Sequence, residues 1–180
     1  MQYLKGVGPK KAALLRNLDI YTVEDLLYHF PRAYEDRGEI KPIVETETMI
    51  GTNVSIYGKI LNSSVRQVNQ KLHILSVLVN DGTDSITAVW FNQKHLASKM
   101  EFGKNILLYG KIERKYGQKE IMVADHQFVG DLTAAKACGK LVPVYPSTGN
   151  FSQKNFRSLL KEVWPKYQVY LQDALPTDLL

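Results

Sequence analysis

The chain has 180 residues, which fits one domain of ordinary size, with or without a small appendage, and excludes two full enzyme domains. Its composition, with 44% hydrophobic and 23% charged residues, is that of a soluble globular protein rather than a disordered or fibrous one. The sequence contains no apolar run long enough for a bilayer span and no signal-peptide core, so we expect a cytoplasmic protein. The single cysteine, Cys138, excludes an internal disulfide.

Positive charge is concentrated in the middle of the chain. The formal net charge is +5. Residues 51–130 carry ten Lys and Arg against six Asp and Glu, whereas residues 1–50 carry seven against eight. A mild excess of this kind permits an anionic partner such as nucleic acid without requiring one.

Two short helices are predicted within residues 1–48, as a helix-hairpin-helix-like segment. The glycine-rich turn Gly6-Val7-Gly8 is followed by Pro9, which favours a helix start, and apolar residues at helical spacing continue to Leu18. Thr22 is the expected N-cap of the second helix. Its apolar stripe and its stop are expected at Leu26, Leu27, Phe30 and Pro31.

From about residue 52 the hydrophobic pattern changes to period two, which indicates β-strands. Five strands are predicted, at residues 54–61, 72–79, 85–91, 106–113 and 120–128. A short helix at 95–100 separates the third strand from the fourth, and a tight turn at 80–84 joins the second to the third. The polar stretch 62–71 is expected to be a long, flexible connection.

The order of these elements, β-β-β-α-β-β, is that of an OB-fold, a five-stranded Greek-key barrel whose sheet face and hairpin loops bind oligonucleotides or oligosaccharides. The predicted fold class is therefore mainly β with flanking helices. The barrel is expected at residues 49–131, between the helical segment 1–48 and a C-terminal part, 132–180, with an extended segment and a helix capped by Ser152. The apolar stripe of that helix is expected at Phe151, Phe156, Leu159, Leu160, Val163 and Trp164.

No catalytic motif is present. The sequence lacks a P-loop for triphosphates and the HExxH and GxSxG motifs. The four histidines, which lack metal-ligand spacing, are His29, His73, His95 and His126. We therefore expect that this chain by itself neither hydrolyses ATP nor holds a cofactor or a metal.

The glycine turn near the N-terminus is a first candidate for DNA contact. Backbone N–H groups at the start of a helix can hold a phosphate without reading sequence. The candidate contacts are Gly6, Gly8, Lys10 and Lys11. The glycines can equally serve only to close a tight turn between packed elements, and the two interpretations are balanced.

Two hairpin connections of the predicted barrel are basic, and one of them has an aromatic residue at its tip. This composition suits phosphate contact and base stacking. The candidate contacts are Arg114, Lys115, Tyr116 and Lys119 in the loop at 111–119, and Arg66 and Lys71 in the connection at 62–71. Charged tips also protect strand edges from pairing, so a solvated hairpin is the alternative.

Two adjacent aromatic residues, Trp90 and Phe91, end the third predicted strand. Adjacent strand residues point to opposite faces, so one ring can fill the core while the other stays at the surface beside Lys94 and His95. An exposed ring that stacks on a base contributes about 1 to 3 kcal/mol. In a simple core strand, Phe91 would instead pack against the following helix.

Six stretches of the sequence recur as a set in one known family. They are GVGPKKA (6–12), TVEDLLYHFP (22–31), Arg32 with YEDR (34–37), VWFNQ (89–93), LYGK (108–111) and LVPVYP (141–146). They resemble the opening and the wedge domain of the RecG family of ATP-dependent DNA helicases, and the resemblance covers essentially the whole chain.

The resemblance implies an OB-fold wedge at the branch point of a stalled replication fork or Holliday junction, with an aromatic ring at the position of Phe91 stacked on the first unpaired base. It implies that the chain is a fragment, and that two motor domains, absent here, use ATP and Mg²⁺ to pull duplex DNA during fork regression, repair and recombination. The expected partners are branched DNA and those motor domains, at the nucleoid in the cytoplasm. No membrane partner is expected, and the chain itself is expected to be monomeric.

His95 departs from the pattern of the family, because some members have a second aromatic residue at its position. An imidazole can still stack on a base, but its ring is smaller. Trp90 or Lys94 would compensate for it.

Two other functions remain as alternatives from different classes. A general single-strand-binding module would have the same barrel and basic loops but no preference for branched DNA. A protein-interaction OB module would bind through an apolar groove and would be insensitive to salt.

Overall fold

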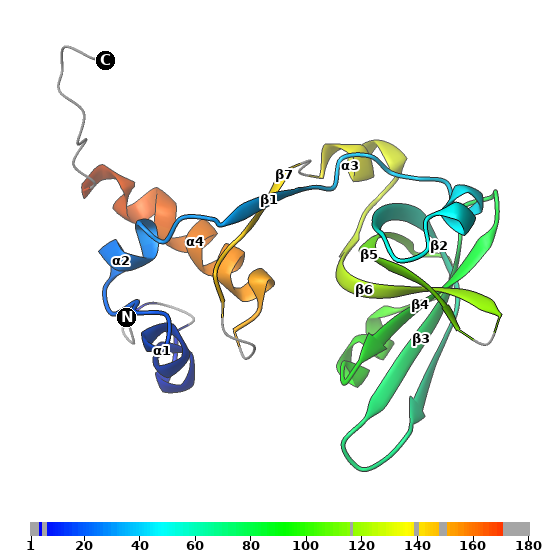
Figure 1. Cartoon of the computed structure of the whole chain (residues 1–180), viewed down its shortest axis with the longest axis horizontal. Coiled ribbons are helices and arrows are strands. Elements are labelled where there is room, and N and C mark those ends of the chain that lie inside the picture. Colours follow the sequence, from blue (N-terminus) through cyan, green and yellow to red (C-terminus); the bar gives the residue numbers. More distant parts are fainter. Residues whose placement is uncertain (1–3, 5–6, 116, 139–140, 148–150, 171–180) are drawn as a thin grey trace. The chain divides into compact units, whose positions relative to one another are not determined.

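The chain is organised in two compact units in the computed structural model, which describes residues 4, 7–115, 117–138, 141–147 and 151–170 (Figure 1). We name them the helical unit, residues 1–35 and 143–180, and the barrel unit, residues 36–142. The division of the sequence into 1–48, 49–131 and 132–180 differs from this grouping. The reason is that the C-terminal helix shares one hydrophobic core with the two N-terminal helices.

The helical unit holds α1 (Pro9–Arg16), α2 (Val23–Leu27), α4 (Gln153–Tyr167) and the 3-10 helix η3 (Gln168–Tyr170). Thr22 caps α2 as predicted. Its Oγ1 accepts a hydrogen bond from the Asp25 N–H (3.1 Å), and the Asp25 carboxylate accepts one from the Thr22 N–H (2.9 Å). Hydrogen bonds from Thr22 and Tyr21 lower the pKa of Asp25. The prediction that Phe30 belongs to the apolar stripe was wrong, since α2 ends before it and its ring is exposed.

α4 supplies the apolar face of the helical core. Ser152 is its N-cap, as predicted, and the Ser152 Oγ accepts a hydrogen bond from the Asn155 N–H (3.3 Å). The side chains of this core come from all three α-helices and the segment before α4, and include Leu15, Leu26, Phe151, Phe156, Leu159 and Val163. Trp164 is half-exposed, contrary to the prediction, because it follows the buried Val163 by one residue and so points about 100° away around the helix.

The barrel unit is a closed barrel of five strands. They are β2 (Asn53–Gln67), β3 (His73–Asn80), β4 (Ser85–Phe91), β5 (Asn105–Lys115) and β6 (Gln118–Phe128). The hydrogen-bonded order is β2-β3-β4-β6-β5, and β2 also pairs with β5 to close the barrel. Only the β4–β6 pairing among these is parallel. The predicted five-stranded barrel with flanking helices is confirmed.

β2 is longer than predicted. The stretch 62–71 was expected to be a flexible connection, but β2 continues to Gln67 and pairs with β3 down to the opposite His73, so that only 68–72 form the loop. The pairing shifts register between Ile60 and Asn62, at a β-bulge. Beyond the bulge, the paired segments of β2 and β3, which we name the ribbon, extend away from the β2–β5 closure of the barrel (Figure 1). β4 pairs with the other edge of β3 as far as Phe91, opposite Ile74.

One glycine of the barrel is required by a close approach between strands. The β5–β6 pairing is irregular between Tyr109 and Gly110. A Cβ atom at Gly110 would lie 2.2 Å from the carbonyl oxygen of Met122. No side chain fits there without moving backbone, which gives the physical reason for the glycine in the LYGK stretch.

Several short elements complete the fold. They are the 3-10 helices η1 (Ile43–Thr48) and η2 (Lys94–Lys99), the helix α3 (Leu132–Ala137), and the strands β1 (Ala33–Asp36) and β7 (Leu141–Val144), which form a two-stranded sheet. η2 replaces the helix predicted at 95–100 and buries Leu96 in the barrel core. None of the helices in the described ranges is long and apolar enough to cross a membrane.

Asp81 connects the β3–β4 turn to η1. Its Oδ2 accepts a hydrogen bond from the Ile43 N–H (2.7 Å), and its Oδ1 accepts bonds from the N–H (2.8 Å) and the hydroxyl (2.7 Å) of Thr83. Burial raises the pKa of Asp81, but these hydrogen bonds outweigh it, so the pKa lies below its ordinary value of 3.8. The charged carboxylate is therefore the form that stabilises the fold.

Replacing Asp81 with asparagine is expected to lower the free energy of unfolding at pH 7 by about 1 to 3 kcal/mol, measured by urea denaturation. A carboxylate whose pKa is lower in the folded state stabilises the fold above its unfolded pKa, and this stability is lost as the pH falls through the folded pKa. The difference between Asp81→Asn and wild type should therefore be constant above about pH 5 and shrink below it. Glu101→Gln, which removes an exposed partner of Lys104, is the control and should cost less than about 0.5 kcal/mol. If Asp81→Asn and Glu101→Gln lowered the free energy of unfolding by the same amount, the Asp81 carboxylate would not stabilise the fold through its hydrogen bonds.

Candidate nucleic-acid interface

The outer face of the sheet carries three residues in a row across three strands. Residues directly opposite each other in antiparallel strands share a face. Ile74 of β3 lies opposite Phe91 of β4, and Arg66 of β2 lies opposite Ile74. Because neighbouring strands are about 4.8 Å apart, Arg66 lies about 10 Å from Phe91 along this row. We name these three residues the Phe91 row.

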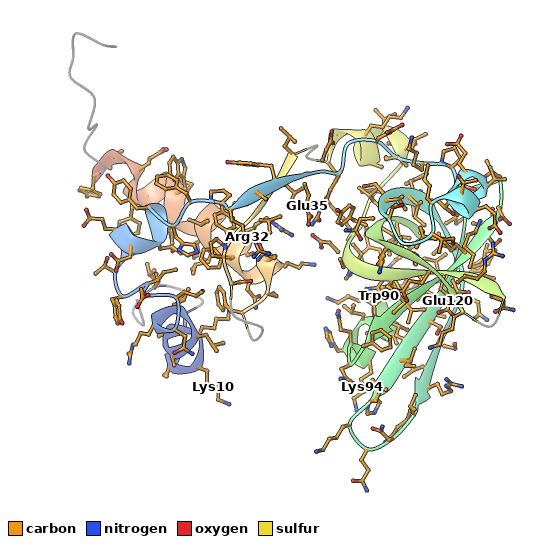
Figure 2. All side chains as sticks on the ribbon, viewed as in Figure 1. Lys10, Arg32, Glu35, Trp90, Lys94 and Glu120 are labelled. Atoms are coloured by element: carbon orange, nitrogen blue, oxygen red, sulfur yellow. The ribbon has the colours of Figure 1, made fainter. Side chains whose placement is uncertain are left out.

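Trp90 and Phe91 point to opposite sides of β4. Trp90 is 2% exposed and lies among the barrel strands, opposite the buried Leu75 (Figure 2). Its ring packs edge-on against the ring of His126, with 5.7 Å between the two ring centroids. Phe91 is 43% exposed. Because a buried ring cannot stack on a base, the structure contradicts the prediction that Trp90 contacts DNA. Phe91 stays the candidate stacking residue.

The chain turns sharply after Phe91. Asn92 has a φ of 56°, a left-handed conformation that asparagine adopts more readily than most residues. Its side-chain oxygen accepts a hydrogen bond from the His73 N–H (3.0 Å), and its own N–H donates to the His73 carbonyl (2.8 Å). η2 follows, and its first residue, Lys94, is exposed (Figure 2). His95 is exposed as well. The turn therefore fixes Phe91 at the end of β4 and brings Lys94 and His95 to the same end.

The cations of the β5–β6 hairpin lie at the other end of β4. β4 and β6 run parallel with Thr87 opposite Glu120, so the tip of the hairpin lies beside the start of β4. Phe91 closes β4 six residues after Ser85, a distance of about 20 Å. The structure thus separates Phe91 from the hairpin candidates Arg114, Lys115 and Lys119.

Two of these hairpin cations form ion pairs with acidic residues of the same chain. Arg114 forms an ion pair with Glu47 of η1. Lys119 contacts Glu47 (3.5 Å) and Asp84 (3.1 Å), donates to the Ile43 carbonyl (2.9 Å), and its side chain is only 8% exposed. Hydrogen bonds from the Ser85 N–H and from Lys119 lower the pKa of Asp84, so this partner stays charged. Lys119 is thus committed to its own chain, which contradicts its predicted role in DNA contact.

The remaining basic candidates differ in their surroundings. Lys115 is exposed at the end of β5, and Tyr116 lies outside the described residues. Arg66 and Lys71 are exposed, Arg66 in the Phe91 row and Lys71 in the loop between β2 and β3. Within the described ranges, neither side chain forms an ion pair or a hydrogen bond. These two cations are therefore available to a phosphate at the end of β4 that carries Phe91.

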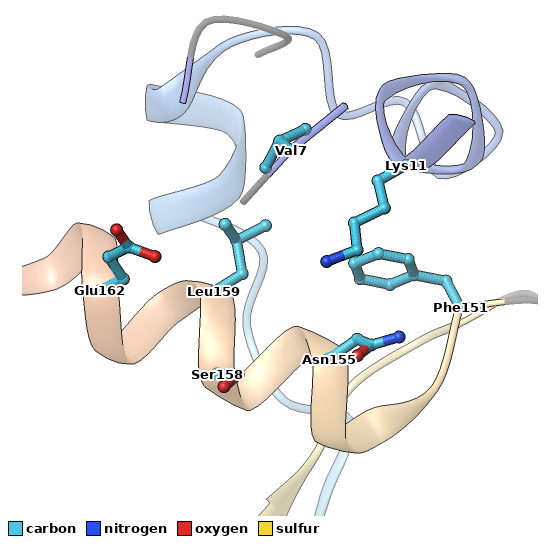
Figure 3. A pocket seen from close by; sticks show the side chains of 7 residues that line it. All are labelled: Val7, Lys11, Phe151, Asn155, Ser158, Leu159 and Glu162. Atoms are coloured by element: carbon cyan, nitrogen blue, oxygen red, sulfur yellow. The ribbon is translucent and has the colours of Figure 1, made fainter. Parts of the chain in front are cut away.

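The glycine turn belongs to the helical unit. Gly8 is the N-cap of α1, without a side-chain capping bond, and Gly6 lies outside the described residues. Lys10 is exposed, whereas Lys11 reaches toward α4 and lies over Phe151 at a pocket of about 140 Å³ (Figure 3). The phosphate contact proposed for this turn stays a prediction.

Sequence reasoning missed three residues of this region. Ile74 could have been found, because the register of a hairpin follows from its turn, and counting outward from the turn at 80–84 places Ile74 opposite Phe91. Asp84 carried a weaker signal as an acidic residue at the start of a strand. No signal identifies Glu47, because 67 residues separate it from Arg114.

Comparisons with known proteins identify the same architecture. The family model of the RecG wedge domain matches residues 1–166. The ATP-dependent DNA helicase RecG of Thermotoga maritima is 32% identical over 184 residues, which cover 100% of this chain and 23% of that protein. RecG of Escherichia coli (strain K12) is 29% identical over 179 residues, covering 98% of this chain and 25% of that protein.

A solved structure of RecG bound to a three-way DNA junction matches the fold with a TM-score of 0.80 and 32% sequence identity, covering 99% of this chain and 24% of that one. The chain thus spans about a quarter of the length of these relatives. The family model covers the helical segments on both sides of the barrel as well as the barrel. The chain therefore belongs to the RecG wedge domain family.

Proposed function

We propose that this chain is the branched-DNA-binding wedge of a RecG-type ATP-dependent DNA helicase, and that it recognises stalled replication forks and Holliday junctions. The observation that carries the proposal is the half-exposed ring of Phe91 at the end of a strand in a closed barrel. The similarity to RecG bound to a three-way junction supports it. Exposed Lys94, Arg66 and Lys71 at the same end of β4 supply positive charge for the phosphates beside that ring, and exposed His95 lies at this end as well.

The wedge acts by position and does no work itself. When the motor domains of a RecG-type parent pull duplex DNA, the bases at the branch lose their neighbours in the helical stack. A base that stacks on Phe91 regains about 1 to 3 kcal/mol of stacking free energy, so separating the strands at the branch costs less than it would without the ring. ATP and Mg²⁺ would bind to the motor domains, and no residue of this chain is assigned to either.

The proposal is tested by titrating the chain with a fork, a four-way junction, a linear duplex and a single strand of matched length, at two salt concentrations. We expect the branched DNAs to bind about tenfold more tightly than the linear duplex, because only they have a branch point, where a base can leave its pair at the end of an arm and stack on Phe91. The affinity should fall as salt rises, with a slope of about 0.7 to 0.9 for each phosphate contact.

Three outcomes would contradict the proposal. Equal affinity for branched and linear duplex DNA would show that the chain does not recognise branch points, and would rule out the wedge function. A single strand that binds as tightly as the fork would favour a general single-strand-binding module. Salt-insensitive or absent DNA binding would favour a protein-interaction module.

A further inference from the structure

Acidic residues are absent from one long stretch of the barrel sequence. No Asp or Glu occurs between Glu47 and Asp81. This stretch includes all of β2 and β3 and carries Lys59, Arg66 and Lys71. In contrast, the described part of the β5–β6 hairpin pairs its cations with acidic residues, as in the contact of Arg114 with Glu47. The cations beside Phe91 therefore come from the ribbon of β2 and β3 and from Lys94 of η2, and not from the β5–β6 hairpin.

The Phe91 row connects the stacking ring to this ribbon. Ile74 lies between Phe91 and Arg66, and its side chain is half-buried, so it offers an apolar surface beside the Phe91 ring. Arg66 follows about 10 Å from Phe91. The β2–β3 loop, with Lys71 exposed, lies just beyond. Phe91, Ile74 and Arg66 thus follow one another in a line across three strands, and Lys71 lies past the strand ends in the loop that joins β2 to β3.

The ribbon also offers hydrogen-bonding groups to a phosphate backbone. β2 pairs with β5 only up to Lys59, so between 62 and 67 its second edge has no partner strand among the described residues. Backbone N–H groups on a free strand edge can donate to phosphate oxygens. The exposed side chains of this segment add hydroxyl, amide and guanidinium donors, from Asn62, Ser64, Arg66 and Gln67.

We infer that the unpaired DNA strand, after stacking its first base on Phe91, crosses Ile74 toward Arg66 and the Lys71 loop, and does not run toward the β5–β6 hairpin. This inference rests on the proposed function, since it specifies the path of the strand that the wedge separates. The opposite path would lead to Arg114 and Lys119, which would have to leave Glu47 and Asp84 before they could contact a phosphate. The path over Ile74 breaks no ion pair of the described residues.

The test compares Arg66→Ala with Arg114→Ala, which lowers the net charge by the same amount. Each variant and the wild type are titrated with two forks of one sequence, whose unpaired strand at the branch has either a single nucleotide or about six nucleotides. We expect the wild type to bind the longer strand more tightly. Arg66→Ala should lose this gain and should reduce the salt slope on the longer fork by about 0.7, the value for one phosphate of a single strand. Arg114→Ala should keep the gain in affinity on the longer fork and the salt slope of the wild type.

Each other outcome has a distinct meaning. A loss in Arg114→Ala but not in Arg66→Ala would reverse the path and overturn the inference. An equal loss of Arg66→Ala on both forks would mean that Arg66 contacts the duplex arm, which also overturns it. Failure of the proposed function is a separate result, because it would appear in the wild type as equal affinity for forked and linear DNA. Thermal unfolding checks that both variants are folded, as expected for exposed side chains.

Discussion

Replacing Trp90 with alanine is expected to lower the free energy of unfolding by about 3 to 5 kcal/mol. The ring is 2% exposed, and it belongs to a core cluster with side chains from every strand of the barrel. A closed barrel cannot collapse around the cavity that the substitution leaves. The indole Nε1 is buried without a hydrogen-bond partner in the described part of the chain, so the expected cost is one of packing rather than of a lost hydrogen bond. Urea denaturation followed by circular dichroism measures it.

The second of the two tryptophans in the chain provides the matched control. Trp164 is half-exposed on α4, so Trp164→Ala should cost less than about 1 kcal/mol. Trp90→Phe keeps most of the aromatic volume and removes the unpaired N–H, so it should cost less than Trp90→Ala. If Trp90→Ala cost no more than Trp164→Ala, Trp90 would not be a core residue. The outward direction of Phe91 would then lose its basis as well.

The barrel was predictable because its strands are buried on one face. Alternating apolar residues in β3, β4, β5 and β6 gave their positions from the sequence. The second half of β2 gave no such signal, because nearly all residues from 61 to 67 are exposed and polar residues occupy both faces. Its pairing with β3 comes from hairpin register, which a polar sequence does not reveal. η1 and α3 are short, and each buries few residues, so neither produces a helical pattern.

The candidate site was predictable only where the signal is local. Period-two alternation separates Trp90 from Phe91 in the sequence itself, although it does not say which ring is inside. The closure of the barrel decides that, since it directs Trp90 inward. The acidic partners of Arg114 and Lys119 come from η1 and from the β3–β4 turn, far away in the sequence. Counting basic residues in a loop therefore overestimated the charge that this hairpin offers to DNA.

Replacing Phe91 with alanine is expected to weaken binding to a fork by about 1 to 3 kcal/mol, which is roughly 5- to 150-fold in Kd. The ring is 43% exposed at the end of β4, so its removal should lower the free energy of unfolding by only about 1 kcal/mol. Affinity for a linear duplex should not change, because no unpaired base is present to stack. Fluorescence anisotropy with labelled fork and duplex measures both affinities, and urea denaturation measures stability.

Two further variants separate stacking from general apolar contact. Phe91→Leu keeps an apolar side chain but no aromatic face, so it should bind forks nearly as weakly as Phe91→Ala, whereas Phe91→Tyr should bind like the wild type. Phe102→Ala is the matched control, because Phe102 is 80% exposed and its neighbour Gly103 bonds to Ile60, near the opposite end of the β2–β3 pairing. It should leave fork affinity unchanged. If Phe91→Ala and Phe102→Ala weakened fork binding equally, exposed apolar surface in general would account for the binding. Phe91 would then have no specific stacking role at the branch point.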